Sequence, residues 1–247
     1  MRTKGKGKSV IWWIAASLCA FFVKGLCGFA NTLVFSTIMS FGLSNLNISP
    51  VELLLGYPTN MLLAWQERRR IDLKLCLPLA ALVVLGSIPG MLLLKNADTG
   101  IIKLLFGIVI AGIGLEMLLR RQSEKKTKES RRMLALIGLL SGVLCGLYGI
   151  GALLGAYIGR VTQDSGAFRA NICVVFFVEN TLRIVLYTAA GILTTGMLLH
   201  ALRLMPFMAL GLYLGIKSRA LLDERSVRKL VIIMLIISGL ALIAAQI

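Results

Sequence analysis

Residues 146–151 read Gly-Leu-Tyr-Gly-Ile-Gly and interrupt Met133–Gly159, an apolar stretch of 27 residues. A matching stretch, residues 25–30 (Gly-Leu-Cys-Gly-Phe-Ala), lies 121 positions earlier and interrupts Val10–Leu43. A helix needs about 20 apolar residues to cross a bilayer core, so both stretches are too long for one upright pass. Glycine weakens a helix at such points. We therefore predict that each stretch is a broken or re-entrant helical element.

The composition places the whole chain in a membrane. Of its 247 residues, 57% are hydrophobic and 15% are charged, whereas a soluble domain has about 45–50% apolar and about 25% charged residues. This surplus of apolar surface predicts an all-α polytopic membrane protein. Eight apolar stretches are the candidate helical elements: Val10–Leu43, Pro50–Trp65, Leu73–Leu94, Ile101–Leu119, Met133–Gly159, Ile172–Gly191, Gly196–Ile216 and Leu230–Ile247.

The two halves of the chain resemble each other beyond the glycine segments. Asn60 matches Asn180 at an offset of 120, and the glycine pairs 86/90 and 211/215 match at an offset of 125. A constant order and a near-constant offset indicate an internal duplication, which is common in secondary transporters. We divide the chain into a basic N-terminus (1–9), a first membrane repeat (10–119), a basic linker (120–132) and a second membrane repeat (133–247).

Charge predicts how the halves are oriented. The formal charge is +16, and basic loops prefer the cytoplasm. In the first half the basic loop is Arg68–Arg70, but its counterpart Thr188–Thr195 carries no charge. The second half is basic in the neighbouring loops instead, so we predict an inverted repeat. The N-terminus and the linker are both expected on the cytoplasmic side of a multi-pass protein in the cell (inner) membrane.

Three ionisable residues inside apolar stretches need an explanation, since a charge at the bilayer centre costs about 2.5–3.5 kcal/mol on insertion scales. Glu179 and Arg183 lie four residues apart on one helical face. Arg183 is a candidate anion ligand, with Glu179 as its counter-ion or as a proton-coupling carboxylate. The alternative is a self-neutralising pair that helps a helix insert. Lys24 adjoins the first glycine break, where it is either a ligand or a snorkelling lysine.

Unwound backbone at the glycine segments would leave helix N-termini inside the membrane, and such termini bind anions. Close helix packing is the alternative role of these glycines. For the paired asparagines we weigh a substrate contact against a helix–helix contact. The candidate substrate-binding residues are Lys24, Gly25, Gly28, Asn60, Gly146, Gly149, Gly151, Asn180 and Arg183.

This pattern resembles the TauE/SafE family of membrane permeases over almost the whole chain. The resemblance is carried by the two glycine segments, by Asn60, by Arg68–Asp72 with Pro78, and by Arg169-Ala170-Asn171. It implies export of sulfite or an organosulfonate. Residues 28–31 (Gly-Phe-Ala-Asn) depart from the family pattern, which usually has further glycines there, and this departure predicts a less open first break.

We therefore expect a secondary transporter of a small sulfur-containing or carboxylate anion, driven by an ion gradient or by the membrane potential. The alternatives are a passive anion channel and a non-transporting membrane assembly protein. The sequence has no G-x-x-x-x-G-K-[ST] and no H-E-x-x-H, so we expect no enzyme, no cofactor and no metal. The expected partners are the lipid bilayer and a small anion, not nucleic acid, and a homodimer is left open.

Overall fold

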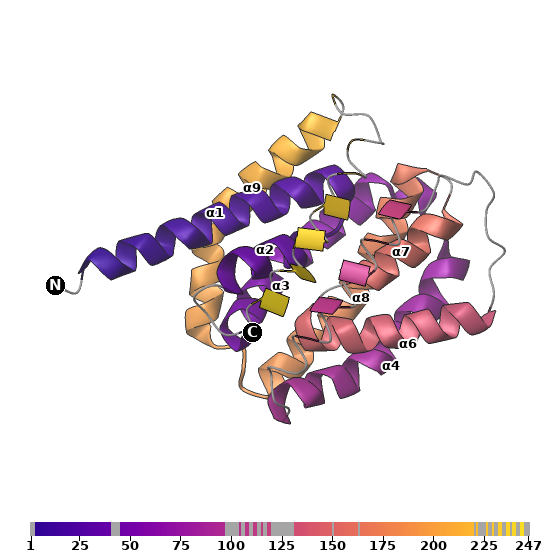
Figure 1. Cartoon of the computed structure of the whole chain (residues 1–247), viewed down its shortest axis with the longest axis horizontal. Helices are drawn as coiled ribbons and strands as arrows, with labels where there is room; N and C mark the ends of the chain where they lie inside the picture. The colour runs from indigo at the N-terminus through magenta and orange to yellow at the C-terminus, as the bar shows by residue number, and fades with distance from the viewer. Residues whose placement is uncertain are drawn as a thin grey trace.

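The computed structural model describes residues 3–40, 45–96, 131–149, 151–162 and 164–219, with single positions between 104 and 119 and between 221 and 244. The elements with defined bounds are all helices (Figure 1): α1 (Thr3–Cys27), α2 (Asn31–Ser40), α3 (Asn45–Gln66), the 3-10 helix η1 (Arg68–Arg70), α4 (Leu73–Asn96), α6 (Arg131–Tyr148), α7 (Ala152–Val161), α8 (Ser165–Ala189) and α9 (Thr195–Arg219). The predicted stretches Ile101–Leu119 and Leu230–Ile247 lie mostly outside the described residues.

Helix length and composition confirm the predicted class, an all-α polytopic membrane protein. Among the described residues, four helical segments are long and apolar enough to cross a membrane: Val10–Cys27, Leu73–Leu92, Ser165–Ala189 and Thr195–Arg219. Large apolar side chains also remain exposed along these helices, for example Leu77 at 71% and Val185 at 58%. In a bilayer such side chains would face lipid.

Both predicted breaks are present. Residues 28–30 separate α1 from α2, and residues 149–151 separate α6 from α7. Gly28 has a φ of 84° and Gly149, its repeat mate at an offset of 121, has a φ of 71°. This left-handed conformation favours glycine, which has no Cβ to clash with the backbone.

The first break opens without the further glycines of the family pattern. Ala30, whose repeat mate is Gly151, adopts a φ of 70°. A non-glycine residue pays about 1–2 kcal/mol for this conformation. The first break thus forms without further glycines because Ala30 takes the strained conformation itself; that this break is the less open one stays a prediction. Strain of this kind is typical of functional sites.

Each broken element folds back toward the end of the bundle where it began. Near the start of α1, the Trp13 ring contacts Phe35 of α2, with 5.8 Å between centroids. In the second half, α6 starts beside α4, where Gly138 faces Leu79 and Leu82. The residues after α7 return to that same end, because Asp164 pairs there with Arg70. The two elements are thus re-entrant, as the sequence predicts.

Glycine allows two helix pairs to pack with their backbones in close approach, α9 on α1 and α4 on α6. The contacts correspond pair by pair. In the first pair of helices, a side chain at Gly211 would meet the carbonyl of Leu18, and a side chain at Gly215 would meet the carbonyl of Phe22. In the second pair, Gly86 faces the carbonyl of Leu139 in the same way, and Gly90 faces the carbonyl of Val143. The glycines differ by 125 positions and the carbonyls by 121. The duplication seen in the sequence is therefore present in the packing.

Helices α3 and α8 occupy equivalent places in the two halves and cross at the centre of the bundle. Ser49 near the start of α3 lies 3.4 Å from the hydroxyl of Tyr187 near the end of α8. Further along α3, Tyr57 stacks on Phe177. Helices α3 and α8 therefore run antiparallel. Because they are equivalent in the repeat, the two halves are inverted relative to each other.

The start of α1 and the basic loop lie at opposite ends of this bundle. Helices α1 and α9 are parallel, because Trp13 contacts His200 early in α9 while Gly25 faces Leu212 and the backbone beyond it. Arg219, at the end of α9, lies 3.8 Å from Glu67 next to η1. Helix α6 also begins at this end, where Gly138 faces Leu79 and Leu82. The starts of α1 and α6 therefore lie at opposite ends of the bundle. Most of the linker lies outside the described residues, so its cytoplasmic side stays a prediction.

Candidate anion-binding site

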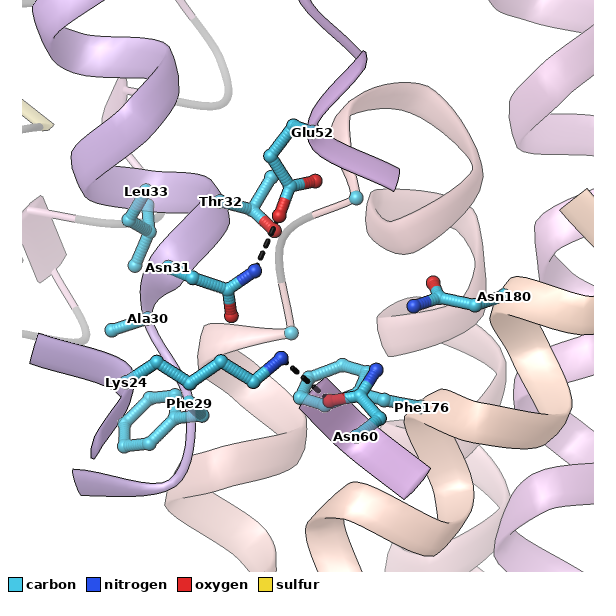
Figure 2. Close-up of a pocket in the computed structure, with 12 residues that line it drawn as sticks. Lys24, Phe29, Ala30, Asn31, Thr32, Leu33, Glu52, Asn60, Phe176 and Asn180 are labelled. Carbon is cyan, nitrogen blue, oxygen red and sulfur yellow. Dashed lines mark hydrogen bonds between the residues drawn. The ribbon is translucent and has the colours of Figure 1, made fainter. Parts of the chain in front are cut away.

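A cavity lies where the two broken elements meet (Figure 2). The space between its lining atoms is about 350 Å³ when the part that opens to solvent is included. The first break contributes residues 29–33 and the second contributes Gly149 and Gly151. The remaining lining residues come from α1, α3 and α8: Lys24, Glu52, Asn60, Phe176 and Asn180.

Two helix N-termini from different halves lie at this cavity. The first N–H groups of α2 and α7 have no carbonyl one turn earlier to bind. The first α2 bond of this kind is donated by Val34 to Ala30, at 3.1 Å. At α7 the N-cap position is Gly151, which has no side chain to bind these groups. Free N–H groups and the positive end of the helix dipole together favour an anion.

Three polar side chains add hydrogen-bond donors. Lys24 is 1% exposed, and its Nζ donates to Oδ1 of Asn60 at 2.6 Å. That bond uses the Asn60 oxygen and leaves its Nδ2 group toward the cavity (Figure 2). Asn180 extends into the cavity from the opposite side; it is 7% exposed and has no hydrogen-bond partner among the described residues. The amide atoms of Asn180 are not fully buried, so water or a ligand in the cavity can satisfy them.

Glu52 is a site residue that we did not predict from the sequence. It is 2% exposed, lines the cavity and accepts a hydrogen bond from Nδ2 of Asn31, the first residue of α2. Thr32 lies beside the same carboxylate (Figure 2). A carboxylate inside the apolar run 51–55 was the available signal. We missed it because Pro50 looked like the start of a helix that in fact begins at Asn45.

Arg183 and Glu179 lie behind the second break and do not line the cavity. Arg183 is 1% exposed; its Nη2 donates to Oγ of Ser49 at 2.6 Å, and its Nε lies 3.7 Å from Oε1 of Glu179. A Cβ at Gly149 would lie only 2.6 Å from Nη1 of Arg183. The guanidinium thus supports the backbone that lines the cavity rather than facing the cavity itself.

Three of the predicted glycines lie outside the cavity. Gly25 and Gly146 are inside helices, where they face the backbone of Leu212 and Ser87 respectively. Close helix packing, the alternative that we weighed, therefore describes their contacts. Gly28 makes the first break, but a Cβ there would overlap the stem of Arg169. The cavity brings together the other predicted residues apart from Arg183: Lys24, Asn60, Gly149, Gly151 and Asn180.

An ion-pair cluster lies at the end of the bundle next to Gly28. Arg169 is 3% exposed and donates to Glu67, which Arg70 and Arg219 also approach at 3.6 and 3.8 Å. At the edge of this cluster Asp164 caps α8. The N–H of Ala167 holds the pKa of Asp164 below its ordinary value, helped by the N–H of the residue before it and by Arg70.

The comparison with family models agrees with this architecture. Residues 13–242 match the model of the family described as Sulfite exporter TauE/SafE. The chain belongs to this family. No curated protein and no solved structure gives a significant match to this TauE/SafE protein.

Family membership and the apolar helices together give the coarse function. This TauE/SafE protein is a multi-pass membrane transporter, and its substrate is sulfite or a related small anion. The family is one of transporters rather than of enzymes.

Proposed function

We propose that this TauE/SafE protein is a secondary transporter that exports sulfite or an organosulfonate and binds it in the cavity between α2 and α7. The observation that carries this proposal is the unpartnered amide of Asn180, which points into a cavity lined by Lys24 and two helix N-termini. Three kinds of donor therefore converge from both halves. An oxyanion accepts hydrogen bonds from all of them, and bonds between charged groups are the stronger ones.

Arg183 and Glu179 have a supporting role in this proposal. Arg183 adds a positive charge behind Gly149 and fixes the second break through Ser49. Glu179 is its counter-ion, which is the first of the two roles predicted for it. A pair with both members 1% exposed keeps the cationic side chain inside the bundle at an acceptable electrostatic cost.

Transport then consists of exposing this cavity to one side of the cell membrane at a time. An inverted repeat supports such alternation, because the two halves have the same packing in opposite orientations. We assign the cytoplasmic side to the end that carries Arg70, Arg169 and Arg219, since basic residues concentrate on that side. The ion-pair cluster at that end would then close the cytoplasmic entrance in this conformation. An ion gradient or the membrane potential supplies the driving force.

A flux assay in proteoliposomes tests the proposal across sulfite, thiosulfate, sulfoacetate, taurine and simple carboxylates. We expect saturable flux of a sulfur oxyanion by the wild type. Lys24→Met should lose most of it, about tenfold or more, because hydrogen bonds to a charged group contribute about 1.5–3 kcal/mol. Arg203→Met is the matched control, since Arg203 is exposed on α9 and outside the cavity.

The outcomes separate the alternatives. Flux that rises without saturation would favour a passive channel, and no flux of any anion would favour an assembly protein. Equal flux in the wild type and Lys24→Met would show that the cavity is not on the transport path.

A further inference from the structure

The fully buried charged groups near the cavity balance one another. Four charged side chains of the described helices are at most 2% exposed: Lys24, Glu52, Glu179 and Arg183. Two are positive and two are negative, so their sum is zero. Arg169, which is 3% exposed, pairs with Glu67 in the ion-pair cluster and does not line the cavity. A buried charge without compensation is costly. A bound monoanion would therefore leave one uncompensated negative charge inside the bundle.

Glu52 is the acid that an arriving anion would meet. Its carboxylate lines the cavity and already occupies the tip of α2, where it accepts a hydrogen bond from Asn31. The Glu52 carboxylate therefore competes with the substrate anion for the positive N-terminal end of α2. Glu179 does not line the cavity, and its oxygen lies 3.7 Å from Arg183.

The groups around Glu52 come from three neighbouring helices. Lys24 on α1 and Arg183 on α8 attract the carboxylate, and Glu179 on α8 repels it. The neighbours on α2, Asn31 and Thr32, carry no charge. On α8 the Tyr187 hydroxyl binds Arg183 at 3.3 Å, and on α3 itself Asn60 is bound to Lys24. An anion bound in the cavity would also repel the Glu52 carboxylate, from a shorter distance than Glu179 does.

We propose that Glu52 takes up one proton when a monoanion binds at the tip of α2. The proton leaves the bulk solution and binds a carboxylate oxygen of Glu52, so the buried charges again sum to zero and Glu52 no longer competes with the anion for the end of α2. This inference rests on the proposed function. By linkage, a proton on Glu52 must strengthen anion binding as much as the anion strengthens proton binding.

Proton uptake can be measured directly. Purified protein in weakly buffered detergent solution with a pH-indicator dye is titrated with methanesulfonate, a monoanion that does not itself titrate near neutral pH. We expect the wild type to bind as much as one proton for each anion that it binds. Its Kd should rise by about tenfold per pH unit once Glu52 is ionised in the empty protein.

Two variants make the measurement specific. Glu52→Gln should bind methanesulfonate with no proton uptake and a Kd independent of pH, whereas Arg203→Met, whose side chain is exposed on α9 and outside the cavity, should retain both wild-type properties. Binding by the wild type without proton uptake, or uptake that persists in Glu52→Gln, would overturn the inference. If Glu52→Gln does not assemble, the proton count of the wild type decides. No saturable anion binding by the wild type would instead overturn the proposed function, and this inference with it.

Discussion

Tyr57 and Phe177 stack with 4.9 Å between their ring centroids, and they are 120 positions apart in the sequence, the same offset that relates Asn60 to Asn180. Two repeat mates can touch only where the pseudo-twofold axis between the halves passes. This axis therefore lies between α3 and α8. The cavity is close to it, since Asn60 and Asn180 both line the cavity.

The second break should be more sensitive to a side chain than another glycine of the same conformation. Gly149 and Gly191 have φ values of 71° and 68°. Alanine at either position should cost about 1–2 kcal/mol of stability. Only Gly149→Ala should also lose anion binding, because its Cβ would displace Arg183, whereas Gly191 has open space around it. Thermal unfolding and anion titration of both variants check this, and equal binding in the two would contradict it.

The glycines of α9 should matter for packing rather than for the substrate. Gly215→Ala places a Cβ against the carbonyl of Phe22 and so forces α1 and α9 apart. Overpacking of this kind costs about 1–3 kcal/mol. Gly196→Ala is the control, because its nearest atom would be 3.9 Å away. We expect a lower melting temperature for Gly215→Ala alone, and a similar decrease for both variants would argue against the close approach.

Asp164 should make stability depend on pH in the acidic range. The pKa of Asp164 is lowered in the folded protein, so its contribution is present above its unfolded pKa of about 3.9 and is lost as the pH falls through the folded pKa. Asp164→Ala should cost about 1 kcal/mol at neutral pH through loss of the cap. Asp164→Asn can still cap α8 but does not titrate. Unfolding in detergent should show a smaller acid loss for Asp164→Asn than for the wild type.

The sequence predicted the backbone of the site better than its side chains. The breaks were predictable because both glycine clusters lie inside apolar stretches that are too long for one pass, and because the two clusters match at an offset of 121. The same clusters do not reveal which glycine unwinds: Gly28 and Gly149 do, while Gly25 and Gly146 pack against neighbouring helices. That distinction depends on the facing helix, which a local pattern does not contain.

The charged residues show a similar limit. Glu179 and Arg183 were recognised as a pair because they are four residues apart on one helix. Glu52 acts with Asn31 and lies near Lys24, and these partners come from other helices. Contacts of this kind depend on how α1, α2 and α3 pack together. Ala30 is a further example, since alanine gives no sign of a left-handed conformation.

The central claim is that two helix tips from opposite halves bind one small anion. A crystal structure of the protein with selenite, the selenium analogue of sulfite, would locate that anion by its anomalous signal. We predict one strong peak in the cavity, with selenite oxygens about 3 Å from the first N–H groups of α2 and α7. An ordered selenite elsewhere in the bundle, with this cavity empty at saturating concentration, would contradict the account.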